Sequence, residues 1–342
     1  VTHRFTPAFW VTAGLRYGST DAQGFTEAGG YNSNYLTRAY IASVLGFPNP
    51  GALTVVPIAA AEGIKAEESG ESFRLSASWR PVPSVTAYAA VATGFRPPIV
   101  NAFAGRVSTI DPTDIVIPYG ATSDNLINYE FGVKGNWFNH RLFANVALYY
   151  IDWNDIQVQA NRVSDAVQFA TNIGGAFSRG IEFEAMAIPA DGWTIALNGA
   201  FNQAEVDDLT TQEAAISGAI LGARLAGPRA SGSLRVTYDW EIQPGIMANA
   251  SVAVAHVGSF PNSFPNTPGR PLIPLPTYDE TDSYTFVNAN LAVAFDQFTV
   301  GAYVENLFND RSVTYVHPEA FIDARYGRVR PRTVGVRIGY EF

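Results

Sequence analysis

The 342-residue chain contains no cysteine, so it can form neither a disulfide bond nor a thiolate metal site. It also lacks any run of about 18 apolar residues, the length that a membrane-spanning helix requires. Charged residues make up only 15% of the chain and the net charge is -9, which argues against nucleic acid as a partner. The opening VTHRFTPAFW has no signal-peptide pattern, so an exported protein would have lost its signal, or the chain begins inside a longer gene product.

The most regular feature that is present is an alternation of apolar and polar residues. Near the C-terminus, Val334, Val336 and Ile338 are separated by Gly335 and Arg337. A period of two predicts a β-strand with one apolar and one polar face. The alternation recurs over residues 9–18, 73–80, 85–95, 129–137, 142–150, 181–187, 193–202, 233–240, 246–257, 286–296, 298–308 and 333–342.

The connections between these stretches are of two kinds, and the two kinds alternate. Short turns contain Pro, Gly, Asn or Asp, as in residues 81–84 and 190–192. The long connections are residues 19–70, 97–125, 158–176, 204–228, 258–284 and 309–331. A meander with short turns at one end and long loops at the other is the layout of outer-membrane barrels, with the turns in the periplasm and the loops outside. A soluble sandwich would order its loop lengths less regularly.

Aromatic residues indicate which face meets lipid. Four tryptophans lie beside short turns on the apolar face, as an interfacial girdle requires: Trp79, Trp137, Trp193 and Trp240. If the apolar faces turned inward, the outside would carry too few charges for a soluble surface. If they turn outward to lipid, the charged strand residues face a wet interior: Arg16, Arg74, Glu130, Lys134, Glu182, Glu184, Arg235, Asp239 and Arg337. We therefore expect the apolar faces to contact outer-membrane lipid.

Five motifs then carry a resemblance: ATGFRPP (92–98), NYEFGVKG (128–135), RGIEFEA (179–185), VENLFNDR (304–311) and PRTVGVRIGYEF (331–342). Taken in order, they resemble the C-terminal half of TonB-dependent outer-membrane receptors, and GLRY (14–17) is similar to a strand in the middle of those barrels. Locally, Pro97 and Pro98 end strand pairing. The polar side chains around Asn306 can cap a turn. A terminal Phe342 resembles the signal that the outer-membrane assembly machinery recognises.

The resemblance implies an all-β fold, a transmembrane antiparallel meander β-barrel formed by residues 1–342 as a C-terminal barrel portion. The chain would supply about 12 strands of a 22-stranded barrel, and the plug domain would be absent from it. The implied function is an outer-membrane receptor of a Gram-negative bacterium that imports a scarce nutrient (siderophore-iron, cobalamin or oligosaccharide) with energy from TonB through the plug. One alternative is a passive 12-stranded pore that closes by itself, and another is a soluble β-sandwich adhesin or lectin.

The sequence gives no sign of enzyme chemistry or of a cofactor. The four histidines are scattered, and neither an HExxH nor a GxSxG pattern is present, so we expect no catalytic residue and no metal site. Acidic residues in the long loops are interpreted as solvated charges. Aromatic-rich polar loops suit a vestibule that stacks on a ligand and hydrogen-bonds its rim. The candidate substrate-binding residues are Tyr31, Tyr35, Arg96, Tyr119, Phe264, Arg270, Tyr315 and His317.

Overall fold

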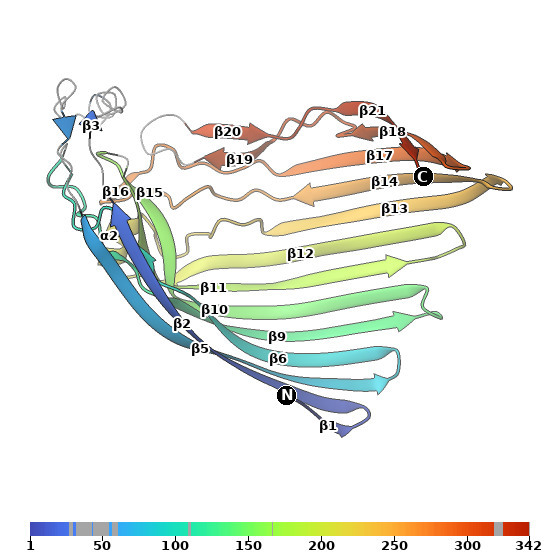
Figure 1. The fold of residues 1–342 in the computed structure, drawn as a ribbon, viewed down its shortest axis with the longest axis horizontal. Coiled ribbons are helices and arrows are strands. Elements are labelled where there is room, and N and C mark those ends of the chain that lie inside the picture. The colour runs from blue at the N-terminus through green and yellow to red at the C-terminus, as the bar shows by residue number, and fades with distance from the viewer. Residues whose placement is uncertain are drawn as a thin grey trace.

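The computed structural model describes residues 1–26, 30–31, 43, 55–56, 61–108, 111–165, 167–317 and 324–341. One antiparallel sheet of 13 strands dominates it, ordered as the strands follow in the chain (Figure 1). The strands are β1 (Thr2–Thr6), β2 (Phe9–Thr26), β5 (Ala61–Val82), β6 (Val85–Arg96), β9 (Asp124–Trp137), β10 (Leu142–Arg162), β11 (Val167–Ala187), β12 (Trp193–Asp208), β13 (Ala230–Gln243), β14 (Ile246–Val257), β17 (Tyr284–Phe295), β18 (Phe298–Glu305) and β21 (Thr333–Tyr340). The predicted all-β meander is confirmed, with β1 added before the first expected strand.

Shorter elements occupy the long connections. They are the pairs β3 (Gly30–Tyr31) with β4 (Val55–Val56), β7 (Ile99–Val100) with β8 (Gly120–Ala121), β15 (Asn266–Thr267) with β16 (Arg270–Pro274) and β19 (Val313–His317) with β20 (Arg325–Arg328), and the helix α2 (Thr211–Ser217). A capping box between Thr210 and Glu213 starts α2, and Gly218 ends it with φ 76°. In the described part of the chain, no helix has the length and apolarity needed to cross a membrane.

The sheet is open, with β1 and β21 at its two edges. These two strands do not pair with each other in the described part of the chain, and Figure 1 shows them at opposite sides of the sheet. A passive pore that closes with 12 of these strands would require such a pairing. The described arrangement therefore gives no support to the self-closed small barrel.

The two faces of the sheet have the chemistry expected for a barrel wall. Large apolar side chains on one face are exposed, among them Leu15 at 78%, Val336 at 71% and Ile338 at 72%. Strand register places the charged residues on the other face, as in the row Lys134, Asn145 and Glu184 across β9, β10 and β11. The buried hydrophobic residues lie almost entirely at the long-loop end, so no dry core forms against the middle of the sheet.

The turns segregate as predicted, with the short turns at one end of the sheet and the long connections at the other (Figure 1). Tight geometry explains several turn residues. Gly192 has φ 78°, and a Cβ built there would lie 2.2 Å from the carbonyl oxygen of Asp239. Residues 138–140 all have positive φ, which bends the chain between β9 and β10.

Two of the predicted long connections are wrong in extent. Residues 158–176 are not a loop, because β10 continues to Arg162 and β11 begins at Val167. The connection predicted over residues 19–70 is shorter than expected, since β2 runs to Thr26 and β5 begins at Ala61. The strands project beyond the length that crosses a bilayer, about 9 to 11 residues, and their polar outer ends read as loops in the sequence.

The aromatic girdle is confirmed at the short-turn end. Trp193, Tyr238 and Trp240 stack in sequence across β12 and β13, with ring centroids 4.6 Å and 5.1 Å apart. At the C-terminal edge of the sheet, the ring centroids of Phe298 and Tyr340 lie 5.0 Å apart. Rings with one apolar body and one polar edge are suited to the headgroup level of a bilayer. Phe342, the expected assembly signal, lies outside the described residues.

The turn around Asn306 is also confirmed as a cap. Asn306 has φ 51° and is 4% exposed. Its amide donates to the carbonyl oxygens of Asp310 (2.8 Å) and Arg330 (2.9 Å), and its side-chain oxygen accepts from the Asp310 N–H at 2.8 Å. The amide therefore satisfies the backbone where the strand leaves the sheet. β6 likewise ends at Arg96, directly before the two prolines.

Candidate functional site

The long connections fold over the polar face at the outer end of the sheet and build a buried layer on the β10–β11 hairpin. One cluster contains Ile156, Ile173, Ala176, Val206, Ala219 and Ala223. A second contains Ile117, Ala160 and Phe169. Because Ala176 and Val206 belong to the polar, inner face of their strands, this layer sits over the interior of the curved wall. A wall end covered in this way is suited to holding a ligand.

A reversal of the hairpin's faces makes this layer possible. Up to Tyr150, the apolar residues of β10 point outward, and Leu148 is 51% exposed. Ile156 has the same even spacing but is 4% exposed and packs with Trp153 from the opposite face. Between them, Asp155 adopts φ 53°, and the Asn172 amide donates to its carbonyl oxygen at 2.6 Å. The strand therefore turns its apolar side inward beyond the membrane-facing segment.

Arg96, at the end of β6, has a different role from the expected one. Its guanidinium forms an ion pair with the fully buried carboxylate of Asp124 and donates to the Gln157 carbonyl oxygen at 3.2 Å. The same group lies 4.7 Å from the Trp153 ring centroid. Asp124 also accepts the N–H groups of Arg96 and Gln157. Arg96 thus joins three strands, and its charge is already neutralised.

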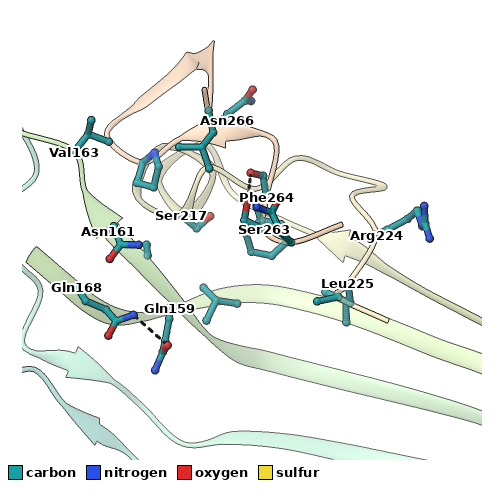
Figure 2. A pocket seen from close by; sticks show the side chains of 16 residues that line it. Gln159, Asn161, Val163, Gln168, Ser217, Arg224, Leu225, Ser263, Phe264 and Asn266 are labelled. Atoms are coloured by element: carbon teal, nitrogen blue, oxygen red, sulfur yellow. Dashed lines mark hydrogen bonds between the residues drawn. The ribbon is translucent and has the colours of Figure 1, made fainter. Parts of the chain in front are cut away.

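A cavity of about 350 Å³ lies between the hairpin and the loops that cover it (Figure 2). Most of its polar lining is neutral: Gln159, Asn161, Gln168, Ser217, Asn262, Ser263 and Asn266. Phe264 and Leu225 supply apolar surface. Of the described residues in the lining, Arg224 alone is charged; it pairs with Glu280 at 3.2 Å and donates to the Ser259 carbonyl oxygen at 2.7 Å. In Figure 2 its guanidinium points away from the other labelled side chains.

Below this layer, the inner wall carries a network of amides and hydroxyls. Asn198 donates to Ser233 at 2.9 Å, and Asn249 donates to Asp239 at 2.6 Å. Ser251 bonds to Asn290, which reaches Asn249 at 3.4 Å. Across the neighbouring strands, the wall carries charges of both signs: Glu182 and Glu184 face the interior beside Lys134, and the two carboxylates form no ion pair within the described residues.

The structure brings one of the predicted residues, Phe264, to the cavity. Arg270 lies in the same loop but pairs with Asp111 at 3.0 Å. Tyr119 is 73% exposed and apart from the cavity lining. Tyr315 and His317, both on β19, lie edge to face with their ring centroids 6.1 Å apart, and neither lines the cavity. The Tyr31 backbone belongs to β3, while its side chain and all of Tyr35 lie outside the described residues.

The amides of the hairpin were not predicted. Asn161 pairs directly with Gln168, and Gln168 donates to Gln159 at 3.4 Å. These residues fell in the segment read as a loop, so no face could be assigned to them. The available signal was the polar-apolar alternation of Gln157, Val158, Gln159, Ala160 and Asn161, which extends the strand. Within the described residues, no three His, Asp or Glu side chains form a metal-binding group.

Acid is expected to loosen the contact between the loops that carry Asp111 and Arg270. Hydrogen bonds from the Thr113 hydroxyl and from the Thr113 backbone N–H, and then the Arg270 ion pair, lower the Asp111 pKa below its ordinary 3.8. A depressed carboxyl pKa adds stability above the unfolded-state value, and this stability is lost as pH falls through the folded value. The protection factors for hydrogen exchange at residues 113–115, which correct for the intrinsic pH dependence of exchange, should therefore fall between about pH 4 and pH 2. Asp111→Asn should exchange faster already at pH 6 and respond less to acid, whereas equal pH profiles would contradict the assignment.

Comparison with known proteins gives the same fold. A family model described as TonB dependent receptor-like, beta-barrel, matches residues 1–307. The ferric yersiniabactin uptake receptor FyuA from Yersinia pestis superposes with a TM-score of 0.70 at 21% identity, over 100% of this chain and 44% of that one. The ferric-catecholate import receptor Fiu from E. coli K12 gives 0.67 at 16% identity, over 100% of this chain and 43% of that one. The copper transporter OprC superposes with a TM-score of 0.62 at 14% identity, over 98% of this chain and 46% of that one.

The chain thus spans less than half the length of each of these three solved structures. Their named cargoes are ferric yersiniabactin, ferric catecholate and copper. At these identities the likeness concerns the fold, and the cargo has to be argued from this chain's own residues.

Proposed function

Because the chain belongs to the family of TonB-dependent receptor-like β-barrels, we propose that it forms the wall and outer loops of a receptor that captures a scarce nutrient and imports it with energy from TonB. The family consists of transport receptors rather than enzymes, and its barrels lie in the outer membrane of Gram-negative bacteria. The apolar face of the sheet would contact lipid, and the polar face would line the interior. The energised gate would be a plug domain, which we place outside residues 1–342, and Phe342 would serve assembly.

The observation that carries this proposal is the covered outer end of the wall. The connections around α2 and β15–β16 pack on the β10–β11 hairpin and form a cavity with it that is partly open to solvent. A nonselective pore is favoured by an open polar lumen. Capture of a dilute nutrient is favoured by a pre-formed cavity with a few polar groups and an aromatic ring. The open sheet, in which β1 and β21 do not pair with each other within the described residues, further disfavours a pore made from this chain alone.

Energy-dependent uptake tests the proposal directly. The full-length gene would be expressed in cells with and without TonB, and the cells would be given labelled nutrients of three kinds: a ferric chelate, a cobalamin and an oligosaccharide. We expect one of them to accumulate in the periplasm at least about tenfold more when TonB is present, because release from a tight site limits passive entry. Equal accumulation of all three in both strains would contradict TonB-driven import and favour a passive channel.

A further inference from the structure

The cavity on the β10–β11 hairpin has a lining that discriminates between the possible cargoes. We propose that it binds a neutral, polyhydroxylated ligand of the saccharide class, and this inference rests on the receptor function proposed above. The polar lining consists of amides and hydroxyls, which present donors and acceptors side by side without charge. Hydroxyl groups on a sugar ring have the same dual character. A multiply charged anion would instead require cations that are not already paired.

Charge inside the cavity is balanced before any ligand enters. Among the described residues, Arg224 is the only ionisable one in the lining, and its guanidinium is bound to Glu280 and to the Ser259 carbonyl oxygen. The part of the lining that the structure describes contains no carboxylate. An anionic chelate placed here would lose its hydration and gain no cation in return. A neutral ligand exchanges hydrogen bonds with water for hydrogen bonds with amides at little electrostatic cost.

The amides that line the cavity retain hydrogen-bonding capacity. No hydrogen bond within the described residues involves the side chain of Asn161. Gln159 and Gln168 share a single contact at 3.4 Å, which leaves donors and acceptors on both. Phe264 and Leu225 add apolar surface against which the C–H face of a sugar ring can pack. Amides opposite an aromatic ring form a site for a ring-shaped polyol.

The interior beneath the cavity is consistent with the same class. Asn249, Ser251 and Asn290 form a neutral polar surface on β14 and β17. On the other side, Glu182 and Glu184 present carboxylates to the interior, as does Glu130, which accepts from the Tyr88 hydroxyl at 2.5 Å. Lys134, Arg235 and Arg337 line the same interior, so charges of both signs face it. A neutral saccharide meets hydrogen-bonding groups along this route and is neither repelled by the carboxylates nor held by the cations.

Binding to the full-length receptor in detergent tests the inference. The neutral probes are maltotriose, xylotriose and chitotriose, and the anionic probe is the tris-catecholate complex of Fe(III), all measured by calorimetry. We expect at least one trisaccharide to bind and Asn161→Ala to weaken it about five- to tenfold, as the loss of one hydrogen bond predicts. The matched control is Gln212→Ala, an exposed amide on α2 outside the lining, which should bind like the unaltered receptor.

Two results would overturn the inference: absence of binding by all three trisaccharides at millimolar concentration, or binding of the ferric complex that Asn161→Ala weakens. Uptake in cells with and without TonB separates this failure from failure of the proposed function. TonB-dependent uptake of the ferric complex would leave the receptor function intact and refute the saccharide class. Saccharide uptake that is equal in both strains would retain the ligand class and refute energised import.

Discussion

Replacing Arg162 with alanine is expected to open the tip of the β10–β11 hairpin and to expose the loops that rest on it. The guanidinium is 0% exposed and forms a two-bond ion pair with Asp165, with both distances 2.8 Å. It also donates to the carbonyl oxygens of Arg106 at 2.5 Å and Ile115 at 2.9 Å. Removal would leave the Asp165 carboxylate without its cation and the Ile115 carbonyl oxygen without this donor, whereas the Arg106 carbonyl oxygen would keep the Ile117 N–H at 3.3 Å; the local cost should be about 3–5 kcal/mol.

Hydrogen exchange of the receptor in micelles measures this effect. A local loss of that size accelerates exchange about a hundredfold or more at residues 103–117 and 158–173. The matched control on the same hairpin is Arg179→Ala, whose exposed guanidinium bonds to neutral Gln203 at 2.8 Å, and which should change protection by less than about 0.5 kcal/mol. Arg162→Lys should fall between the two, because it keeps the charge and loses the planar fork. Similar protection in all variants would show that the tip is held by packing alone.

The same residue shows why the loop end was harder to predict than the wall. A strand's face can be read locally, because its side chains alternate with a fixed period and the lipid contact is continuous. Arg162 is anchored by Arg106 and Ile115, which lie 56 and 47 positions away. Such partners are brought together by loop folding, and no local period marks them. A buried arginine and a solvated one look alike in the sequence.

The reversal at Asp155 is a second case. Gly is the usual sign of a positive φ, but here Asp155 adopts φ 53° and the Asn172 amide holds its carbonyl oxygen. The even positions are apolar through Tyr150, then polar at Asp152 and Asn154, and apolar again at Ile156 and Val158, where they face the loop core instead of lipid. The sequence period therefore identified the inner part of the strand but neither its outer extent nor the side that is buried there. That is why Phe264 was recognised as a binding candidate, but Asn161 was not.

A charge placed on the outward face of β12 should destabilise the protein, whereas the same charge placed one residue further along the strand should have little effect on its stability. Leu197 lies in the apolar stretch of β12 between Trp193 and Phe201, is 40% exposed and pairs with Leu234. Leu197→Arg would put a guanidinium among lipid chains, at a cost of about 2–4 kcal/mol near the bilayer midplane. Asn198→Arg introduces the same side chain on the inner face, opposite Glu184, where water and a carboxylate receive it.

Folding into lipid vesicles distinguishes the two faces. Urea unfolding of the full-length receptor should show Leu197→Arg destabilised by the stated amount, and Asn198→Arg within about 0.5 kcal/mol of the unaltered protein. Exchanging lipid for a polar amphipol should shrink the difference, because the penalty comes from hydrocarbon and not from packing against Leu234. If instead Asn198→Arg were the damaging change, the polar face would be the one buried. The receptor interior, its amide-lined cavity and the cargo inferred from it all depend on Leu197 facing lipid.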